Sequence, residues 1–324
     1  MKLERALIAL ALAGFAAAAP AQGWLPKRSV EIVVGFAAGG SQDQTARTVE
    51  RLLVANKLVN VPITVVNKPG ASGSIGFTYV SQRPGDGHTL MVAGPSLVSG
   101  YIMGSSALNY TDFTPIAALY DDCIAFSLNA ASPIRTGKDL IERLKKDPKS
   151  VTVGIVAVGG GTHVSALLLQ KAIGGNMRDL KVVSFKAGAE VIINLLGGHI
   201  ELAATTAVVA HPHIAAGRLR IVAVAASRRL GGALAGVPTW TEQGVDLVTR
   251  SWRAIMGPRG MAAAQIDYWE NALRKVTETA EWKADLEKNL WVEDFMTGAQ
   301  FRRNLDKDYA DHKSVLVELG LAKQ

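Results

Sequence analysis

Five short loops rich in Gly, Ser and Thr carry the residues of this chain that are best suited to binding chemistry. Each loop follows a strand-like apolar run and leads toward a stretch with helical periodicity. Glycine lets backbone N–H groups approach a ligand without a Cβ atom in the way. The first N–H groups of a helix lack internal partners, and the helix dipole makes that end positive. The loops therefore predict a site for a small anion.

The candidate ligand-binding residues lie in these loops and at one later position. They are Phe36, Ala38, Gly39, Gly40, Ser41, Asp43, Ser96, Gly160, Gly161, Thr162, His163, Phe185, Lys186, Gly188, Thr205 and Arg253. The Ser and Thr hydroxyl groups of this set can donate hydrogen bonds to a carboxylate, and Lys186 can add a full charge. His163 serves equally well as a ligand contact or as a helix cap. Arg253 suits bidentate binding of a carboxylate, with an ordinary ion pair as the alternative.

The sequence lacks the motifs of the common enzyme alternatives. It contains neither a Gly-x-Ser-x-Gly nucleophile elbow nor a Gly-x-x-x-x-Gly-Lys-Ser/Thr phosphate loop. His211 and His213 do not have the i, i+4 spacing that places two metal ligands on one helical face. Cys123 is the only cysteine, which excludes an internal disulfide and a thiolate metal cluster. We therefore expect no catalytic residue, no metal and no organic cofactor.

The first residues have the layout of a secretory signal. Lys2 and Arg5 form a short basic start, and an apolar run extends from Ala6 to Ala18. This run is shorter than the roughly 20 apolar residues that a membrane anchor needs. Small residues follow, and we expect cleavage after Ala21, so that residues 1–21 are a signal peptide. The sequence therefore predicts a soluble protein of the periplasm.

Strand-like and helix-like stretches alternate along the rest of the chain. Strands are expected over 29–34, 61–66, 88–93, 116–128, 151–156, 181–185, 200–204 and 219–225, with a further strand-like stretch over 245–250. From Ala262 onward the chain has helical character, with one break around residues 291–298. This alternation is typical of an α/β fold with mainly parallel sheets, in which ligands bind beyond the carboxyl ends of the strands. The basic residues behind the net charge of +7 are scattered, so we expect no nucleic-acid partner.

Several ordered segments resemble one family of receptors. They include VEIVVGFAAGGSQDQTAR, ITVVNKPGASGSIGFTYV, GDGHTLMVA, DFTPIA, LLGGHIELA, HIAAGRLRIVAVAAS and GVPTWTEQGVD. In this order they are similar to the substrate-binding receptors of tripartite tricarboxylate transporters, the Bug-type periplasmic receptors. The resemblance runs through nearly the whole mature chain.

This resemblance implies a two-lobed type II periplasmic-binding-protein fold with the ligand cleft between the lobes. We expect residues 24–122 plus 227–324 to form lobe 1 and residues 123–226 to form lobe 2. The crossings are expected near 120–124 and 225–228. The candidate residues then lie in the cleft, where backbone N–H groups and hydroxyl groups hold the ligand.

The family also implies a small organic carboxylate as ligand and integral-membrane permease subunits as partners of a monomeric receptor. Many members have Asp where this chain has Thr205, and that Asp suits ligands with an ammonium group. Phe185 and Ala187 likewise depart from a Tyr-Lys-Gly pattern. Thr205, Trp252-Arg253 and GDGHTLMVA resemble the subgroup named for tricarboxylates, which favours a di- or tricarboxylate over an amino acid. Two alternatives stay open: a receptor that signals to a sensor kinase, and a secreted α/β hydrolase.

Overall fold

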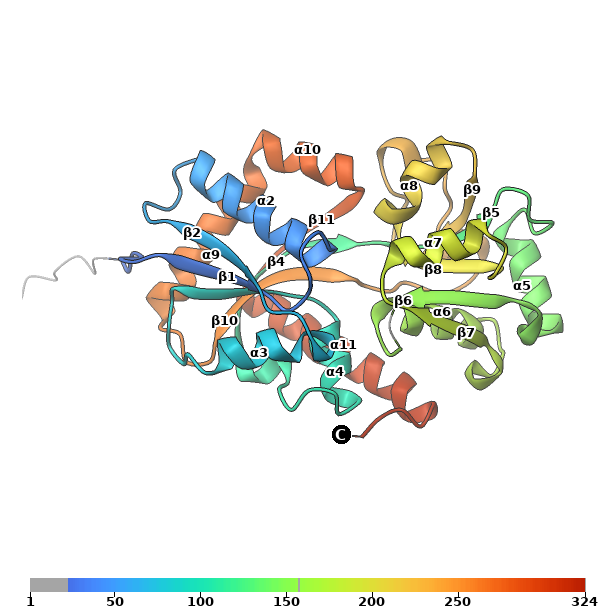
Figure 1. Ribbon diagram of the computed structural model, residues 1–324, viewed down its shortest axis with the longest axis horizontal. Coiled ribbons are helices and arrows are strands. Elements are labelled where there is room, and N and C mark those ends of the chain that lie inside the picture. Colours follow the sequence, from blue (N-terminus) through green and yellow to red (C-terminus); the bar gives the residue numbers. More distant parts are fainter. Residues whose placement is uncertain (1–22, 157, 324) are drawn as a thin grey trace, which may run out of the picture.

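Two α/β lobes lie side by side along the long axis of the protein (Figure 1). The computed structural model describes residues 23–156 and 158–323, so the expected signal peptide lies outside the described residues. Each lobe is built around one sheet. Strand β4 of the first lobe runs toward the second lobe, and β10 runs back from the junction.

The first lobe contains a six-stranded sheet in the order β11-β4-β10-β3-β1-β2. Its strands are β1 (Val30–Val34), β2 (Ile63–Asn67), β3 (Thr89–Ala93), β4 (Phe113–Asp122), β10 (Trp252–Pro258) and β11 (Trp291–Thr297). Its helices are α2 (Ser41–Ala55), α3 (Ser74–Ser81), α4 (Ser96–Ile102), α9 (Ala263–Glu278), α10 (Ala280–Asn289) and α11 (Gly298–Glu318). Strand β3 is buried along its whole length, as expected for a strand covered on both faces.

The second lobe contains a five-stranded sheet in the order β7-β6-β8-β5-β9. Its strands are β5 (Ile124–Asn129), β6 (Thr152–Val156), β7 (Lys181–Phe185), β8 (Leu202–Thr206) and β9 (Leu219–Val224). Its helices are α5 (Gly137–Lys146), α6 (Gly161–Ala172), α7 (Gly188–Leu196) and α8 (Ala207–Ala215). The expected strand over 116–128 is two strands, β4 and β5, which belong to different sheets.

Both sheets are mixed, although the sequence predicts mainly parallel ones. The pairs β1–β2, β1–β3, β6–β7 and β6–β8 are parallel. The pairs that involve β4, β5 and β10 are antiparallel. The reason is that these strands connect the lobes and must run toward or away from the junction, against the direction of their neighbours.

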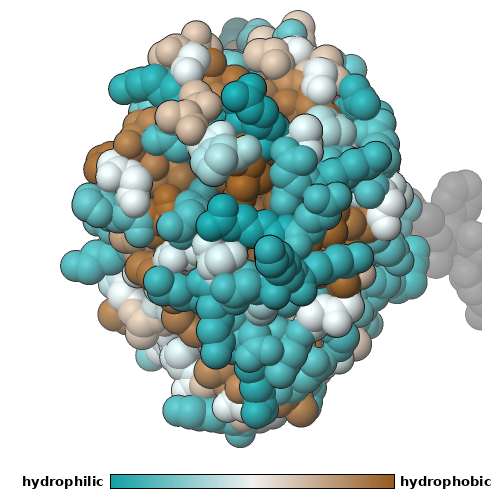
Figure 2. Space-filling model, turned by 90° about the vertical axis from the view of Figure 1, so that its right-hand side faces the viewer, coloured by the Kyte–Doolittle hydropathy of each residue, from teal (hydrophilic) through white to brown (hydrophobic). Residues whose placement is uncertain are grey.

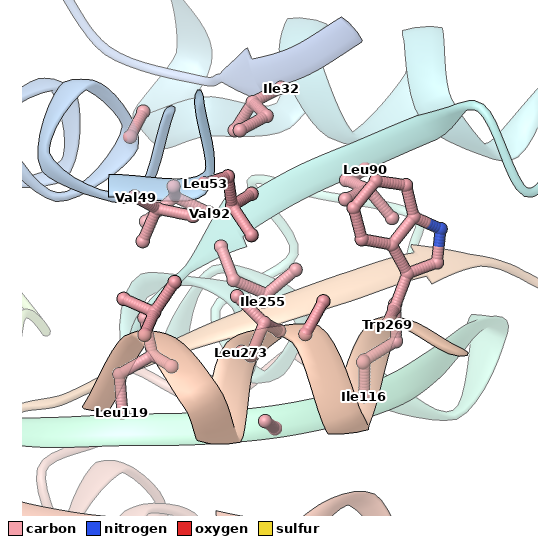
Figure 3. Close-up of a cluster of buried hydrophobic side chains, with 14 of the residues drawn as sticks. Ile32, Val49, Leu53, Leu90, Val92, Ile116, Leu119, Ile255, Trp269 and Leu273 are labelled. Atoms are coloured by element: carbon pink, nitrogen blue, oxygen red, sulfur yellow. The ribbon is translucent and has the colours of Figure 1, made fainter. Parts of the chain in front are cut away.

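One side of the first sheet packs against α2 and α9 (Figure 3). The labelled side chains are Ile32, Leu90, Val92, Ile116, Leu119 and Ile255 from the strands, Val49 and Leu53 from α2, and Trp269 and Leu273 from α9. Trp269 is fully buried, and its indole N–H donates to the carbonyl of Gly87 at 2.8 Å. Truncation of a buried Leu or Trp in such a core costs about 2–5 kcal/mol of unfolding free energy. This core fixes the sheet edge from which the site loops emerge.

Strand direction brings the predicted site loops to two facing edges. Because β1 and β3 are parallel, the loops that follow them leave the first sheet at the same edge. Strand β10 begins at that edge, since its Ala254 pairs with Ala93 near the end of β3. In the second sheet β6, β7 and β8 are parallel, and Ile124 at the start of β5 pairs with Thr206 at the end of β8. The crossings therefore join the edges that carry the site loops, which we call the cleft edges.

The first crossing between the lobes lies where the sequence predicts it, and the second lies later in the chain. The first is Cys123, between β4 and β5, within the expected range. After β9, however, the chain stays on the second lobe: Thr239 bridges to Val224, and Trp240 and Leu247 are buried in the core of that lobe. The chain enters β10 only at Trp252. We therefore propose that the second lobe extends to about residue 249, beyond the expected boundary at 226.

Helix α11 touches both lobes. Phe301 and Leu305 lie in the core of the first lobe, and Val315 lies in the core of the second. Near the end of the helix, the Glu318 carboxylate pairs with Lys171 of α6 at 2.6 Å. The helix thus adds a third connection between the lobes, beside the two crossings.

The outer surface is mostly hydrophilic where the second lobe ends. Figure 2 shows this face, on which hydrophobic residues appear in separate small areas between hydrophilic ones. In the part of the chain that the structure describes, no helix combines the length and the apolar character needed to cross a membrane.

Candidate ligand-binding site

Helices that begin at the cleft edges have no side-chain cap. This applies to α2, α3 and α4 in the first lobe and to α6, α7 and α8 in the second. Their N-cap residues are Gly40, Gly73, Pro95, Gly160, Ala187 and Thr206. The first N–H groups of a helix are donors that need a partner. The cleft edges therefore present several sets of backbone donors, each at the positive end of a helix dipole.

Three helices that begin elsewhere, α5, α10 and α11, are capped by side chains. Thr136 accepts the N–H of Asp139 at the start of α5, and Thr279 accepts the N–H of Trp282 at the start of α10. Thr297 caps α11 in the same way, together with the side chain of Gln300. The cleft-edge helices thus differ from these three. Among the other helices, α9 also has no side-chain cap at Ala262, although the Gln265 side chain accepts the Ala262 N–H at 2.8 Å.

Asp43 holds the loop between β1 and α2 in place. Its carboxylate accepts hydrogen bonds from the Gly39 N–H, from Arg47 Nε and from Asn67 Nδ2, each at 2.9 Å. Burial alone would raise the pKa of Asp43, but these hydrogen bonds and the charge of Arg47 hold it below its usual value. Asn67 also donates to the Phe36 carbonyl. The structure thus gives Asp43 a positioning role, and Ala38, Gly39 and Gly40 are exposed beside it.

Arg253 is committed to partners inside the protein. Its Nε and Nη2 lie 3.2 and 3.1 Å from Ser41 Oγ, and Nη2 lies 3.3 Å from Asp122 Oδ2. Its Nη1 donates to the carbonyl groups of Ser251 and Trp252. Of the two interpretations of Arg253 from sequence, the structure shows the ion pair, here a buried one. The Ser41 hydroxyl donates to Asp122 in turn, so the donor expected for the ligand is already engaged.

Gln42 lies beside this group, and Ser96 begins α4 two residues after Gly94. Gly94 approaches both Gln42 and Arg253 so closely that a Cβ atom on it would lie 3.3 Å from a side-chain nitrogen of each. Ser96 Oγ and Gln42 Oε1 are buried and have no hydrogen-bond partner. Sequence analysis found Ser96 but missed Gln42, which follows Ser41 at the start of α2. Both side chains keep polar atoms available next to the uncapped N–H groups.

The loop between β6 and α6 uses its own side chains internally. The Thr162 hydroxyl donates to the Val156 carbonyl at 3.0 Å and accepts the Val156 N–H at 2.9 Å. His163 Nδ1 accepts the Gly159 N–H at 2.9 Å, which leaves the imidazole proton on Nε2. Burial lowers the pKa of His163 to about 4, so the ring is neutral at neutral pH. His163 Nε2–H is therefore the side-chain donor that this loop retains.

Gly159 also marks where the lobes meet. Its φ angle of +75° lies in the left-handed region, and a Cβ atom at this position would overlap Met103, which follows α4 of the first lobe. The loop that contains Gly160 and Gly161 thus packs directly against the first lobe. The positive φ angle favours glycine at residue 159, and a Cβ atom there would also displace the flexible end of the Met103 side chain.

The remaining predicted residues differ in exposure. Lys186 is exposed, and its N–H donates to the Glu190 carboxylate at 3.0 Å, while Phe185 and Gly188 are half-buried. Thr205 is fully buried with its hydroxyl unpartnered, and it pairs with Ala125 of β5. Its neighbour Thr206 is partly exposed at the start of α8, and the sequence analysis did not single it out. In a strand, adjacent residues face opposite ways, so a shift of one position separates the two threonines.

Two hollows lie near these loops. A groove of about 940 Å³ runs along α2 and is lined partly by Ala38, Gly39 and Asp43. A cavity of about 220 Å³ lies between α6 and α11 and shares only Gly161 with the predicted set. Within residues 23–156 and 158–323, no three His, Cys, Asp or Glu side chains are grouped as a metal site would require.

Comparison with known proteins gives consistent matches. A family model described as "Tripartite tricarboxylate transporter family receptor" matches residues 46–321. Protein BugT of Bordetella pertussis is 29% identical over 258 residues, 78% of this chain and 77% of BugT. A crystal structure of a TctC solute binding protein from Polaromonas is 27% identical with a TM-score of 0.76, over 90% of this chain and 99% of that one.

Two structures from Rhodopseudomonas palustris share the fold. Rpa4515 with adipate is 24% identical with a TM-score of 0.80, over 92% of this chain and 99% of its own. MatC with bound malate is 22% identical with a TM-score of 0.75, over 90% of this chain and 100% of its own. Together with the strand order described above, these neighbours confirm the expected two-lobed α/β fold.

Proposed function

Because this chain belongs to the tripartite tricarboxylate transporter receptor family, we propose that it is a periplasmic receptor that binds a small di- or tricarboxylate and delivers it to a permease. The observation that carries the proposal is the set of uncapped helix N-termini on two facing sheet edges. Each is a ready anion site, and the two edges belong to different lobes.

The geometry suits a ligand with two carboxylates. On the first lobe the N–H groups of Ser41 and Gln42, in the first turn of α2, precede the first backbone hydrogen bond of the helix, which Gln44 donates to Gly40. On the second lobe the first turn of α6 offers the N–H groups of Thr162 and His163 in the same way, since Val164 is the first to bond back. A dicarboxylate that spans both sets stabilises the closed arrangement, because each lobe binds one end.

The side chains around these donors favour an anion over an amino acid. Asp43 and Asp122 are paired with Arg47 and Arg253, so their charge is compensated. No other carboxylate occurs among the candidate residues, and Lys186 adds a positive charge. Among the candidate residues an ammonium group therefore finds no uncompensated carboxylate, although Glu190 lies nearby in the first turn of α7, where it accepts the Lys186 N–H. Adipate and malate in the two fold neighbours belong to the ligand class proposed here.

The proposal includes export, a membrane partner and the absence of turnover. The sequence of the first 21 residues supports export, and the family description supports a role beside a transporter. Binding through backbone N–H groups requires neither a metal nor a cofactor. We further propose that the receptor acts as a monomer, because one chain contributes both cleft edges.

Calorimetry of the mature protein tests this function. Native mass spectrometry first shows whether a ligand is retained after purification, and refolding removes it. We expect titration with succinate, adipate or citrate to give saturable binding that survives a chelator, with the ligand recovered unchanged. Aspartate serves as the matched control, because it adds only an ammonium group to succinate. Preference for aspartate, loss of binding with the chelator, or consumption of the ligand would contradict the proposal.

A further inference from the structure

A buried ion pair lies directly behind the start of α2. Asp122 ends β4, just before the first crossing, and Arg253 is the second residue of β10, just after the return crossing. Their side chains are 1% and 9% exposed and lie 3.3 Å apart. This ion pair therefore joins the two segments that cross between the lobes.

The Ser41 hydroxyl joins this pair to the ligand-binding edge. It accepts from Arg253 Nε and Nη2 and donates to Asp122 Oδ2 at 3.1 Å. Ser41 is also the first residue of α2, whose N–H groups are proposed to bind the carboxylate. The guanidinium group therefore contacts Ser41, the residue whose N–H group is proposed to bind the ligand carboxylate.

Asp122 places a carboxylate against the charge of Arg253. Burial raises the pKa of this carboxyl group, and the Arg253 charge and the Ser41 hydrogen bond oppose that rise. A guanidinium group is always protonated in proteins, so without a counter-charge it would attract any anion at α2. The carboxylate has one oxygen engaged, while Asp122 Oδ1 is buried without a hydrogen-bond partner. A carboxylate kept in such a position is costly to bury, and the compensation of Arg253 gives its presence a reason.

We infer that Asp122 is a specificity-determining residue that limits how strongly the site favours highly charged anions. The inference rests on the proposed function and deepens it. With Asp122 present, the pair behind α2 is neutral, and binding depends on the backbone donors. Without the carboxylate, the Arg253 charge acts on the ligand, and its effect grows with the number of ligand charges.

The test is the ratio of citrate affinity to succinate affinity in the variant Asp122→Asn. Asparagine keeps the shape and a hydrogen-bond acceptor for Ser41 while removing the charge. We expect citrate to bind about tenfold more tightly and succinate about threefold, in line with the Coulomb energy of a third ligand charge screened by water. The affinity ratio should fall back toward the wild-type value in Asp122→Asn/Arg253→Gln, which is neutral again.

Asp121 provides a matched control. It is the preceding residue of β4 and also pairs with an arginine, Arg250, at 3.0 Å. Arg250 additionally contacts Asp294, so it keeps a counter-charge when Asp121 is replaced. Burial raises the pKa of Asp121 to about 7, so the control is measured at pH 8.5, where Asp121→Asn removes one negative charge. It is expected to alter both affinities less than twofold. This separates a local effect at α2 from the total charge of the protein.

Each outcome decides the inference. If Asp122→Asn and Asp121→Asn act alike, or if Asp122→Asn changes both affinities by one factor, the inference is overturned. If Asp122→Asn does not fold, Arg253→Gln at pH 8.5 takes its place, and the ratio must then fall below that of the wild type. A wild-type protein that binds neither acid overturns the proposed function and this inference with it. Wild-type binding with an unchanged ratio in the variants overturns the inference alone.

Discussion

The first N–H groups of a helix need hydrogen-bond partners, and the helices at the cleft edges differ from α5, α10 and α11 in how these partners are supplied. Away from the cleft, threonine side chains accept the first N–H groups of α5, α10 and α11. At the cleft edges, Gly40, Pro95, Gly160 and Ala187 have no side chain that can do so. A good N-cap is worth about 1 kcal/mol. The difference indicates that the cleft helices leave this stabilisation to a ligand.

Side chains in the cleft loops shape the backbone more than they face the ligand. Asp43, Thr162 and His163 each accept a backbone N–H of their own loop. Ser41 is bound to Asp122 and Arg253. The loops are therefore held in one conformation before any ligand arrives, which reduces the entropy cost of binding. The predictions below test this division between cleft and non-cleft helices.

The largest effect is expected from giving a cleft helix the cap that it lacks. Gly40 has extended backbone angles, φ −79° and ψ 169°, and a Cβ atom there meets nothing closer than the Ala37 carbonyl at 3.5 Å. In Gly40→Asp the new carboxylate can accept the N–H groups of α2. We expect stability to rise by about 0.5–1 kcal/mol and dicarboxylate affinity to fall at least ~100-fold.

Denaturant unfolding and calorimetry on the same samples check the two opposite signs. Gly40→Asn, a cap without charge, is the control and should weaken binding less than Gly40→Asp. If affinity is unchanged while stability rises, the N-terminus of α2 is not a ligand site.

An effect of similar size in free energy is expected from the pH dependence of His163. Burial lowers the pKa of His163 from 6.5 to about 4 in the folded protein. Between these values the unfolded chain binds a proton that the folded protein does not, so stability falls as pH decreases from 6.5 to 4. The loss amounts to about 3 kcal/mol at the lower limit.

His163→Asn, which retains an acceptor for the Gly159 N–H, should remove this part of the pH dependence. Urea unfolding at pH 7 and pH 4.5 measures it, with the exposed His199→Gln as a control. A His163→Asn variant that loses as much stability at pH 4.5 as the wild type would show that His163 is not held neutral by burial.

The smallest effect is expected at a capped helix far from the cleft. Thr136 accepts the N–H of Asp139 at 3.1 Å, and Asp139 Oδ2 accepts the Thr136 N–H at 3.0 Å. Thr136→Ala should lower stability by about 1 kcal/mol and leave carboxylate affinity unchanged. A loss of affinity as large as that of Gly40→Asp would remove the distinction between the two sets of helices.

Periodicity predicted the elements best where one pattern was undisturbed. The strand over 181–185 agrees fully with β7, and the strands before the cleft loops are placed to within two residues. β11, Trp291–Thr297, was interpreted only as a break between helices. After Trp291 its residues are half-buried, apart from the exposed Glu293, because β11 lies at the sheet edge. Pairing with β4 determines that place, and the local sequence does not. The sequence predicts a lobe boundary near residue 226. We propose one near 249 instead, because Trp240 and Leu247 pack in the core of the second lobe.

The site could be predicted as a set of loops but not as a set of donors. Gly-rich loops after strands identify the cleft edges, because strand direction alone brings those loops together. Whether Arg253 faces a ligand or Asp122 depends on two strands that are 131 residues apart in sequence. The choice between Thr205 and Thr206 depends on the face of β8, and a single sequence does not fix that register.

The central claim is that backbone N–H groups at the cleft-edge helix starts hold the carboxylate. A ¹H–¹⁵N NMR titration with succinate tests it most directly. We expect the amide resonances of Ser41, Gln42, Thr162 and His163 to shift and their hydrogen exchange to slow, while those of Lys138 and Asp139 at the capped start of α5 stay unchanged. Saturable succinate binding that leaves the four cleft amides unperturbed would contradict the account.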